Sequence, residues 1–248
     1  MIFESGSNVT LTSDNGDVIK NSGNATITVE NGANSTINPH ASTKSFEANT
    51  GQVARGIVSA GGSINVEKGG NLTFNLSQNS GDPYMPGAIY LTNGATITDN
   101  GNIKINVNVN GQPSTGNSMP VYISGSSTIK VGNGAAFEIA AKNLGSYVGS
   151  LFKIDGKGTT VELDPHSTFK ISGDGTGAVT GIELGDESAF TSDQPEEFTI
   201  DLSANTNKDK AFIKNGTINF TSVKNTNVVN IDDDDDYQVP LGKVNVDL

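Results

Sequence analysis

The chain contains no cysteine, which excludes disulfide bonds, thiolate metal sites and a cysteine nucleophile. Histidine is almost as scarce, because His40 and His166 are the only two. Each follows a proline in a turn-like stretch, INPHAS or LDPHST, so we expect both to be turn residues. Neither a histidine zinc site nor a Ser/His/Asp arrangement is therefore predicted.

Positive charge is also scarce, with 15 Lys and Arg against 27 Asp and Glu, a net charge of −12 and a pI near 4.4. Such a surface repels nucleic acids and anionic membranes at neutral pH. No apolar run approaches the roughly 20 residues of a membrane helix. The first residues, MIFESGSN, have neither the basic nor the apolar part of a signal peptide. We expect neither a nucleic-acid partner nor membrane insertion. We also expect the chain to be a fragment of a larger protein whose signal and anchor have been removed.

Hydrophobic residues make up only 34% of the chain, whereas glycine occurs 30 times. This composition suits a solenoid, in which each short strand sends only one or two side chains inward. No helix-period apolar stripe is found. Residues 149–172 instead hold three pieces that alternate apolar and polar residues, Leu151–Ile154, Thr160–Leu163 and Thr168–Ile171. Each is followed by a Gly, Asp or Pro turn signal, which predicts three short β-strands.

This triplet recurs with spacings of 28 to 34 residues. The first piece gives the series Ile57, Ile89, Tyr122, Phe152, Ile182 and Phe212. The second gives Ile64, Ile97, Ile129, Val161, Phe190 and Ile218, and the third gives Leu76, Ile105, Ile139, Ile171, Ile200 and Ile231. A fixed period of this length indicates a solenoid or a propeller, and a propeller blade needs four strands. We therefore predict an all-β, parallel β-solenoid with three strands and about 30 residues per coil, with Phe137, Phe169 and Phe198 in one interior column.

The predicted solenoid is a single domain over residues 1–248. Residues 1–50 form an atypical N-terminal capping coil, with strands near Asn8–Leu11, Val18–Lys20, Ala25–Val29 and Ser35–Ile37. Residues 51–231 form six regular coils, and residues 232–248 hold an acidic loop and C-terminal strands. The segments after the third pieces are the longest and most variable, so their loops should stack on one side of the rod, often the binding side.

These variable segments contain the candidate ligand-binding residues Tyr84, Tyr147 and Tyr237, with Lys142 beside them. Exposed tyrosines stack on sugar rings or anchor protein contacts. The alternative is that the rings cover apolar residues of their own loops. Lys142 would meet an acidic glycan.

A parallel β-helix also suggests a pectate lyase, whose chemistry needs a carboxylate cluster that holds Ca²⁺ and a basic residue that takes the proton. Arg55 is the only arginine in the chain. Nearby carboxylates in the sequence are sparse, with Glu47 and Glu67 the closest. A salt bridge at the fringe of the solenoid is the preferred interpretation, with ligand binding as the alternative.

The acidic run at 232–236 supplies the only metal candidates, Asp232, Asp234 and Asp236. Ordered Ca²⁺ sites space their ligands with intervening residues and turn glycines, and an unbroken acidic run is typical of a solvated loop. We therefore predict no metal and no cofactor, with Ca²⁺ as the alternative.

Three stretches carry a family resemblance: GSSTIKVGNGAAFEI (125–139), KGTTVELDPHSTFKI (157–171) and GGSINVEKGGNLTFNL (61–76). With them the chain resembles the pectate-lyase-like adhesive domains of Gram-positive, lactobacillus-type surface adhesins, such as aggregation-promoting proteins and the binding regions of serine-rich-repeat adhesins. The resemblance implies a right-handed β-solenoid that is extracellular, cell-wall attached or secreted. It implies adhesion rather than catalysis, with glycans, mucin, polysaccharide or the same domain on a neighbouring cell as partners. The resemblance provides no motif from which functional residues of this chain could be assigned.

The predicted function is thus a non-catalytic adhesin domain that binds host or matrix glycans or aggregates cells. Adhesion should be favoured at acidic pH, because the negative net charge and the repulsion between rods fade toward the pI. The alternatives are a polysaccharide lyase or hydrolase acting on acidic glycans, and a structural stalk module.

Overall fold

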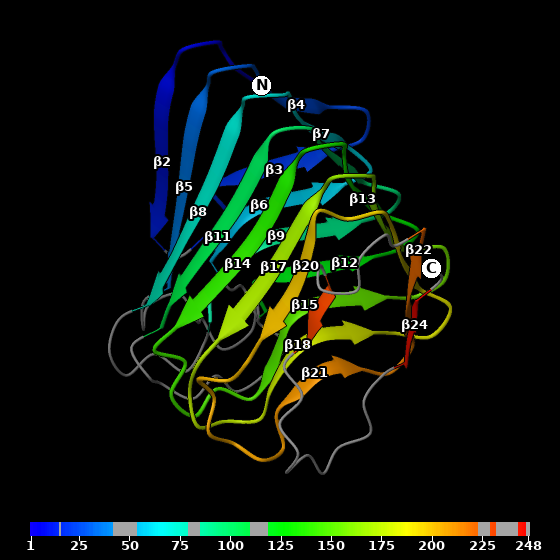
Figure 1. The fold of residues 1–248 in the computed structure, drawn as a ribbon. Helices are drawn as coiled ribbons and strands as arrows, with labels where there is room; N and C mark the ends of the chain where they lie inside the picture. The colour runs from blue at the N-terminus through cyan, green and yellow to red at the C-terminus, as the bar shows by residue number, and fades with distance from the viewer. Residues whose placement is uncertain are drawn as a thin grey trace.

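The computed structural model describes residues 1–14, 16–41, 54–78, 85–109, 119–222, 229–231 and 243–246. These residues form three parallel β-sheets that wind into a β-solenoid with three strands per coil (Figure 1), which confirms the predicted fold. Within this part of the chain, no helix is long and apolar enough to cross a membrane.

Each sheet collects one strand from every coil, in chain order. Sheet A contains β1 (Ile2–Phe3), β4 (Thr26–Val29), β7 (Ser63–Val66), β10 (Thr96–Asp99), β13 (Thr128–Val131), β16 (Thr160–Leu163), β19 (Ala189–Asp193), β22 (Thr217–Thr221) and β24 (Lys243–Val246). Sheet B contains β2 (Asn8–Asp14), β5 (Asn34–Ala41), β8 (Asn71–Gln78), β11 (Asn102–Asn108), β14 (Ala136–Lys142), β17 (Thr168–Gly173), β20 (Glu197–Asp201) and β23 (Val229–Ile231). Sheet C contains β3 (Ile19–Ser22), β6 (Arg55–Ala60), β9 (Gly87–Thr92), β12 (Val121–Ser124), β15 (Gly149–Asp155), β18 (Val179–Leu184) and β21 (Ala211–Lys214).

The register of sheet A confirms the second predicted series throughout, from Ile64 to Ile218. The first series is wrong at two positions, because the register partners in sheet C are Val121 and Ile213 rather than Tyr122 and Phe212. The third series is wrong at its first member, where Phe74 pairs with Ile105. A slip of one residue turns a strand's side chains to the opposite face, so Tyr122 points outward.

The core is a stack of inward-facing Ile, Val, Leu and Phe side chains that runs along the rod. Phe137, Phe169 and Phe198 are fully buried and form the predicted column, with ring centroids 5.7 and 5.4 Å apart. Phe152 and Phe190 pack edge-on against this column. Such contacts between coils add to the area burial and make each coil depend on its neighbours.

The N-terminal strands are present where the sequence predicts them, and β1 is an additional short strand. Phe3, in the predicted N-terminal capping coil, is buried. His166 is a turn residue with φ of 59°, as predicted. The prediction for His40 is wrong, because it lies within β5, where its Nδ1 is 2.9 Å from the Ser77 hydroxyl. Pairing with β2 and β8 extends the strand through Pro39 and His40.

Candidate functional site

The outward faces of the three sheets differ in their chemistry. Sheets A and B present mainly Thr and Asn in their N-terminal halves, as in β4, β5 and β8. Sheet C instead presents tyrosines and charged side chains of both signs. We call Arg55, Tyr90, Tyr122, Asp155, Lys153 and Glu183 the tyrosine strip.

Two tyrosines form the centre of the strip. In β9, Ile89 and Leu91 are buried, so the residue between them, Tyr90, faces outward. Tyr122 is its register partner in β12. The two rings stack with centroids 4.8 Å apart and planes 28° apart.

Arg55 covers the Tyr90 ring from the preceding coil, with its guanidinium carbon 4.8 Å from the ring centroid. Its Nε donates a 2.8 Å hydrogen bond to Asp17 Oδ1, and Nη2 donates one of 3.2 Å to Oδ2. The carboxylate of Asp17 is nearly buried and also lies 3.4 Å from the amine of Lys20. The predicted salt bridge of Arg55 is confirmed, and its partner is a residue that the sequence did not single out.

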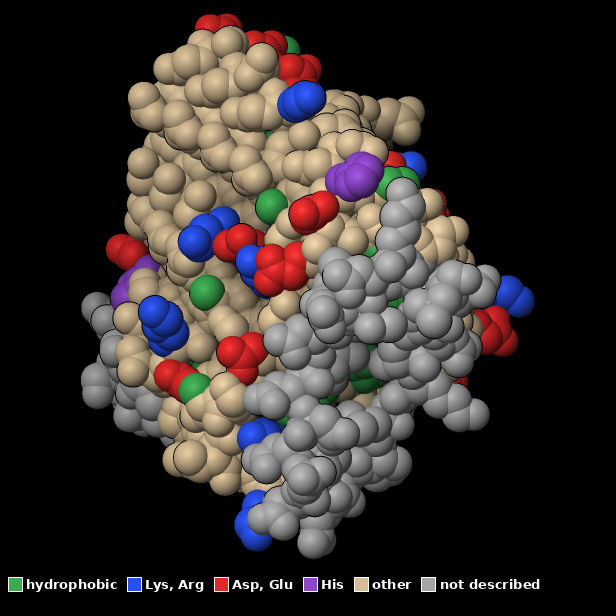
Figure 2. All heavy atoms as spheres, viewed as in Figure 1, with side chains coloured by type: hydrophobic (Ala, Val, Ile, Leu, Met, Phe, Trp, Pro, Cys, Tyr) green, Lys and Arg blue, Asp and Glu red, His purple; other side chains and the backbone are tan. Residues whose placement is uncertain are grey.

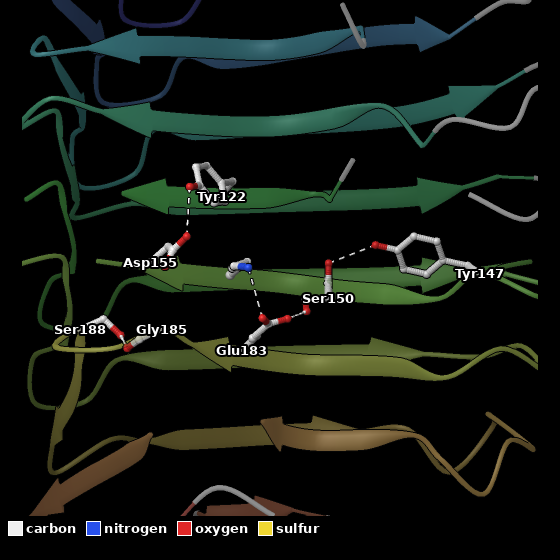
Figure 3. Close-up of polar contacts among 8 residues, drawn as sticks. Tyr122, Tyr147, Ser150, Asp155, Glu183, Gly185 and Ser188 are labelled. Atoms are coloured by element: carbon white, nitrogen blue, oxygen red, sulfur yellow. Dashed lines mark hydrogen bonds and ion pairs between the residues drawn. The ribbon is translucent and has the colours of Figure 1, made fainter. Parts of the chain in front are cut away.

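Tyr122 connects the stacked rings to the following coils (Figure 3). Its hydroxyl donates a 3.3 Å hydrogen bond to Asp155 Oδ2. Partial burial, together with the negative charge of Asp155, raises the pKa of Tyr122 above its ordinary value. The phenol therefore remains protonated and able to donate at neutral pH.

Glu183 is the centre of the neighbouring polar group (Figure 3). The hydroxyl of Ser150 donates a 2.5 Å hydrogen bond to Oε2, and the amine of Lys153 lies 3.2 Å from Oε1. Burial acts to raise the pKa of Glu183, but these two partners outweigh it and hold the pKa below its ordinary value. Glu183 is therefore an ionised and positioned acceptor on the strip.

Tyr147 does not present its ring to solvent, so the prediction of an exposed binding tyrosine is wrong for this residue. The side chain is 0% exposed, and its hydroxyl donates a 3.2 Å hydrogen bond to the carbonyl oxygen of Ser150 (Figure 3). Burial raises the pKa of this phenol. The ring packs in the core that includes Leu144, which is the alternative interpretation of the loop tyrosines.

Lys142 is exposed at the end of β14, directly before this loop. Tyr84 and Tyr237 lie outside the described residues, as do Asp232, Asp234 and Asp236. A ligand-binding role for Lys142, Tyr84 and Tyr237 therefore stays a prediction. Within the described ranges, no group of three or more His, Cys, Asp or Glu residues could hold a metal ion.

The loops that lead into β15, β18 and β21 stack on one side of the rod, as the spacing of the variable segments predicts. Asp174 accepts 2.9 Å hydrogen bonds from the backbone N–H groups of Asn143 and Leu144 in the preceding loop. In the following loop, the amide of Asn205 donates to the carbonyl oxygen of Asp174, and that of Asn207 to Thr176. Each loop is thus tied to its neighbour by side-chain to backbone bonds.

Sequence reasoning missed both tyrosines at the centre of the strip. Tyr122 stands in the first repeated series, although the alternation in Val121-Tyr122-Ile123 places the apolar pair inward. The same alternation in Ile89-Tyr90-Leu91 marks Tyr90 as outward. Strict period-two alternation was therefore the signal that identifies them.

The comparisons with known proteins leave the family open. No protein-family model and no curated protein matches the chain. Among solved structures, a fragment of TibA, hyper-glycosylated by TibC, is 13% identical, with 92% of this chain and 98% of that chain covered. The TM-score is 0.13, and a likeness this weak carries no argument.

Proposed function

We propose that this chain is a non-catalytic adhesive module of a bacterial cell-surface protein, and that the tyrosine strip binds glycans. The observation that carries the proposal is the outward Tyr90–Tyr122 stack with Arg55 over it. Tyrosine and arginine are the residue types that dominate binding hot spots. A parallel β-solenoid, whose coils repeat one face along a rod, is compatible with an adhesive role and with a stalk.

The arrangement favours hydrogen bonding over ring stacking as the mode of sugar recognition. Because β9 lies between β6 and β12, Arg55 and Tyr122 lie on opposite faces of the Tyr90 ring. The ring edge and hydroxyl are therefore what Tyr90 offers a ligand. Together with Asp155 and Glu183, the strip presents phenol donors and carboxylate acceptors, which suit the hydroxyl groups of a saccharide.

The charge balance of the strip favours neutral glycans. Arg55 is paired with Asp17, and Lys153 with Glu183. Few positive charges are thus left for an acidic polysaccharide, and the net charge of −12 opposes its approach at neutral pH.

The same geometry favours binding over lyase chemistry. A lyase needs a basic group that accepts a proton from the sugar. Arg55 is held by both oxygens of Asp17, and a guanidinium does not deprotonate in proteins. Arg55 therefore orients Tyr90 in this proposal.

The proposal is tested with purified domain on surfaces coated with mucin, pectin, neutral polysaccharide and whole cells. The double variant Tyr90→Ala/Tyr122→Ala should weaken glycan binding about thirtyfold or more, because loss of a central hot spot costs about 2 kcal/mol or more. Thr96→Ala, on the outward face of sheet A, is the matched control and should bind normally. Tyr122→Phe separates the contribution of the hydroxyl from that of the ring.

Circular dichroism shows whether each variant retains the fold. Unchanged binding by a folded double variant would remove the strip from the site. The appearance of unsaturated sugar products from pectin would instead support the lyase alternative.

A further inference from the structure

The outward face of β2, β5, β8 and β11 is a lattice of amide and hydroxyl side chains. We call it the amide–hydroxyl face. We define it by twelve outward positions: Asn8, Thr10, Thr12, Asn34, Thr36, Asn38, Asn71, Thr73, Asn75, Asn102, Lys104 and Asn106. Lys104 is the one charged residue among the twelve. The next outward row on the same strands, Asp14, His40, Ser77 and Asn108, borders this face. In Figure 2 this area, at the upper left, is almost entirely tan, the colour of the backbone and of side chains that are neither charged nor apolar.

Hydrogen bonds between coils hold many of these side chains in place. Two ladders of three asparagines cross the face, Asn34–Asn71–Asn102 and Asn38–Asn75–Asn106. In every step the amide nitrogen of one coil donates to the amide oxygen of the preceding coil, at 2.9 to 3.0 Å. The side chains are therefore ordered before any partner arrives, and little rotamer entropy remains to be lost on binding.

In a chain with a net charge of −12, none of these twelve positions is acidic, and the one carboxylate beside them is Asp14, the last outward residue of β2. Farther along sheet B the outward residues become charged and paired, with Lys104 3.7 Å from Glu138 and Lys170 2.6 Å from Glu197. Two copies of the chain can thus approach each other through the amide–hydroxyl face with less repulsion than through the rest of the surface.

We propose that the amide–hydroxyl face binds the same face of a second copy of this chain. Asn and Thr side chains both donate and accept, so the face is complementary to itself across a two-fold axis. Both copies also have the same strand spacing, about 4.8 Å, so a contact made at one coil recurs at the next. An unrelated partner would need that same repeat by coincidence.

The size of the face sets the strength of the association. Four strands at about 4.8 Å and five residues at about 3.3 Å give roughly 320 Å² per copy. The total of roughly 640 Å² is below the roughly 1,200–2,000 Å² of stable interfaces. A single pair is therefore weak, and adhesion requires many copies on two facing surfaces. This inference does not depend on glycan binding by the tyrosine strip.

The first experiment places like charges in the face. Thr36→Lys/Thr73→Lys introduces two lysines in neighbouring strands, in the register column that natively contains Lys104. The matched control, Thr96→Lys/Thr128→Lys, changes two register neighbours on sheet A by the same charge. Sedimentation and the aggregation of domain-coated beads are measured for both. We expect the first pair to reduce association at least tenfold, because like charges then oppose each other across the interface, and the control to leave it unchanged.

The second experiment locates the contact directly and does not depend on disrupting it. The chain has no cysteine, so Thr73→Cys and Thr96→Cys each introduce a unique thiol. Under mild oxidation, Thr73→Cys should form disulfide-linked dimers much faster than Thr96→Cys. A strictly monomeric wild-type chain with no bead aggregation would overturn the proposal. So would equal crosslinking of the two cysteines, or association that both lysine pairs leave intact. Bead aggregation that needs added glycan would assign the adhesion to the tyrosine strip instead.

Discussion

Asp99 should make this solenoid less stable as the pH rises from 5 to 8. It ends β10 in an inward register column whose neighbours on either side are Val66 and Val131. The residue is 0% exposed, and its Oδ1 accepts a 3.0 Å hydrogen bond from the backbone N–H of Gly101. The other oxygen, Oδ2, is buried without a hydrogen-bond partner. A carboxylate in this position loses its hydration with little in return.

Burial raises the pKa of Asp99 from 3.8 to about 7, and the lowering effect of the Gly101 backbone N–H offsets only part of this shift. The folded chain therefore binds this proton more tightly than the unfolded chain does. Stability from this group is present below the unfolded pKa and is lost as the pH rises through the folded pKa. At about 1.4 kcal/mol per pKa unit, the full loss is about 4 kcal/mol, of which about 2.5 kcal/mol falls between pH 5 and pH 8.

The perturbation is Asp99→Asn, which keeps the shape and removes the charge. The variant places an amide in the buried position and loses about 1–3 kcal/mol for the unsatisfied group, at every pH. The free energy of unfolding is measured by urea denaturation at pH 5, 6, 7 and 8 for the variant and the wild type. The free energy of unfolding of the variant, relative to that of the wild type, should rise by about 2.5 kcal/mol from pH 5 to pH 8.

Asp186→Asn removes a carboxylate from an exposed turn and controls for the change in net charge. Comparison at each pH cancels the titration of the other groups. If the stabilities of the Asp99 variant and the wild type run parallel from pH 5 to pH 8, the carboxyl does not titrate there, and the reasoning from its burial is wrong.

Three further predictions concern the core, a loop and the whole rod. Ile171→Asp places a charge between Ile139 and Ile200 in a fully buried column, and should abolish cooperative thermal unfolding or solubility; an unchanged melt would contradict the inward position. Gly177→Ala should lower the free energy of unfolding by about 1–3 kcal/mol, because a Cβ at this position would lie 2.0 Å from the carbonyl oxygen of Tyr147. A melting temperature equal to that of the wild type would show that the two loops separate easily. Self-association should strengthen reversibly from pH 7 toward the pI of 4.4, because the negative net charge decreases in magnitude. Light scattering across this pH range measures it. A monomer at every pH would rule this out, and irreversible particles would indicate isoelectric precipitation.

The architecture was predictable from the amino-acid sequence alone. Period-two alternation, turn signals and a recurrence near 30 residues are local signals that every coil repeats. A strand that is ambiguous in one coil can therefore be assigned from the corresponding strands of the other coils. These signals predicted three strands per coil, the complete inward series from Ile64 to Ile218, and the column of Phe137, Phe169 and Phe198. They also predicted that the variable loops stack on one side.

The contacts between polar residues, in contrast, were evident only in the folded chain. Because the coils differ in length, a spacing near 30 residues predicts the strand register only to within one residue. A register shift of one residue turns the inward side chains of a strand outward. For this reason the outward position of Tyr122, beside Tyr90, was not predicted. The structure also supplied Asp17 as the partner of Arg55, 38 residues away, and buried Tyr147 in its own loop. Such contacts depend on how neighbouring coils pack, a property that no single repeat of the sequence contains.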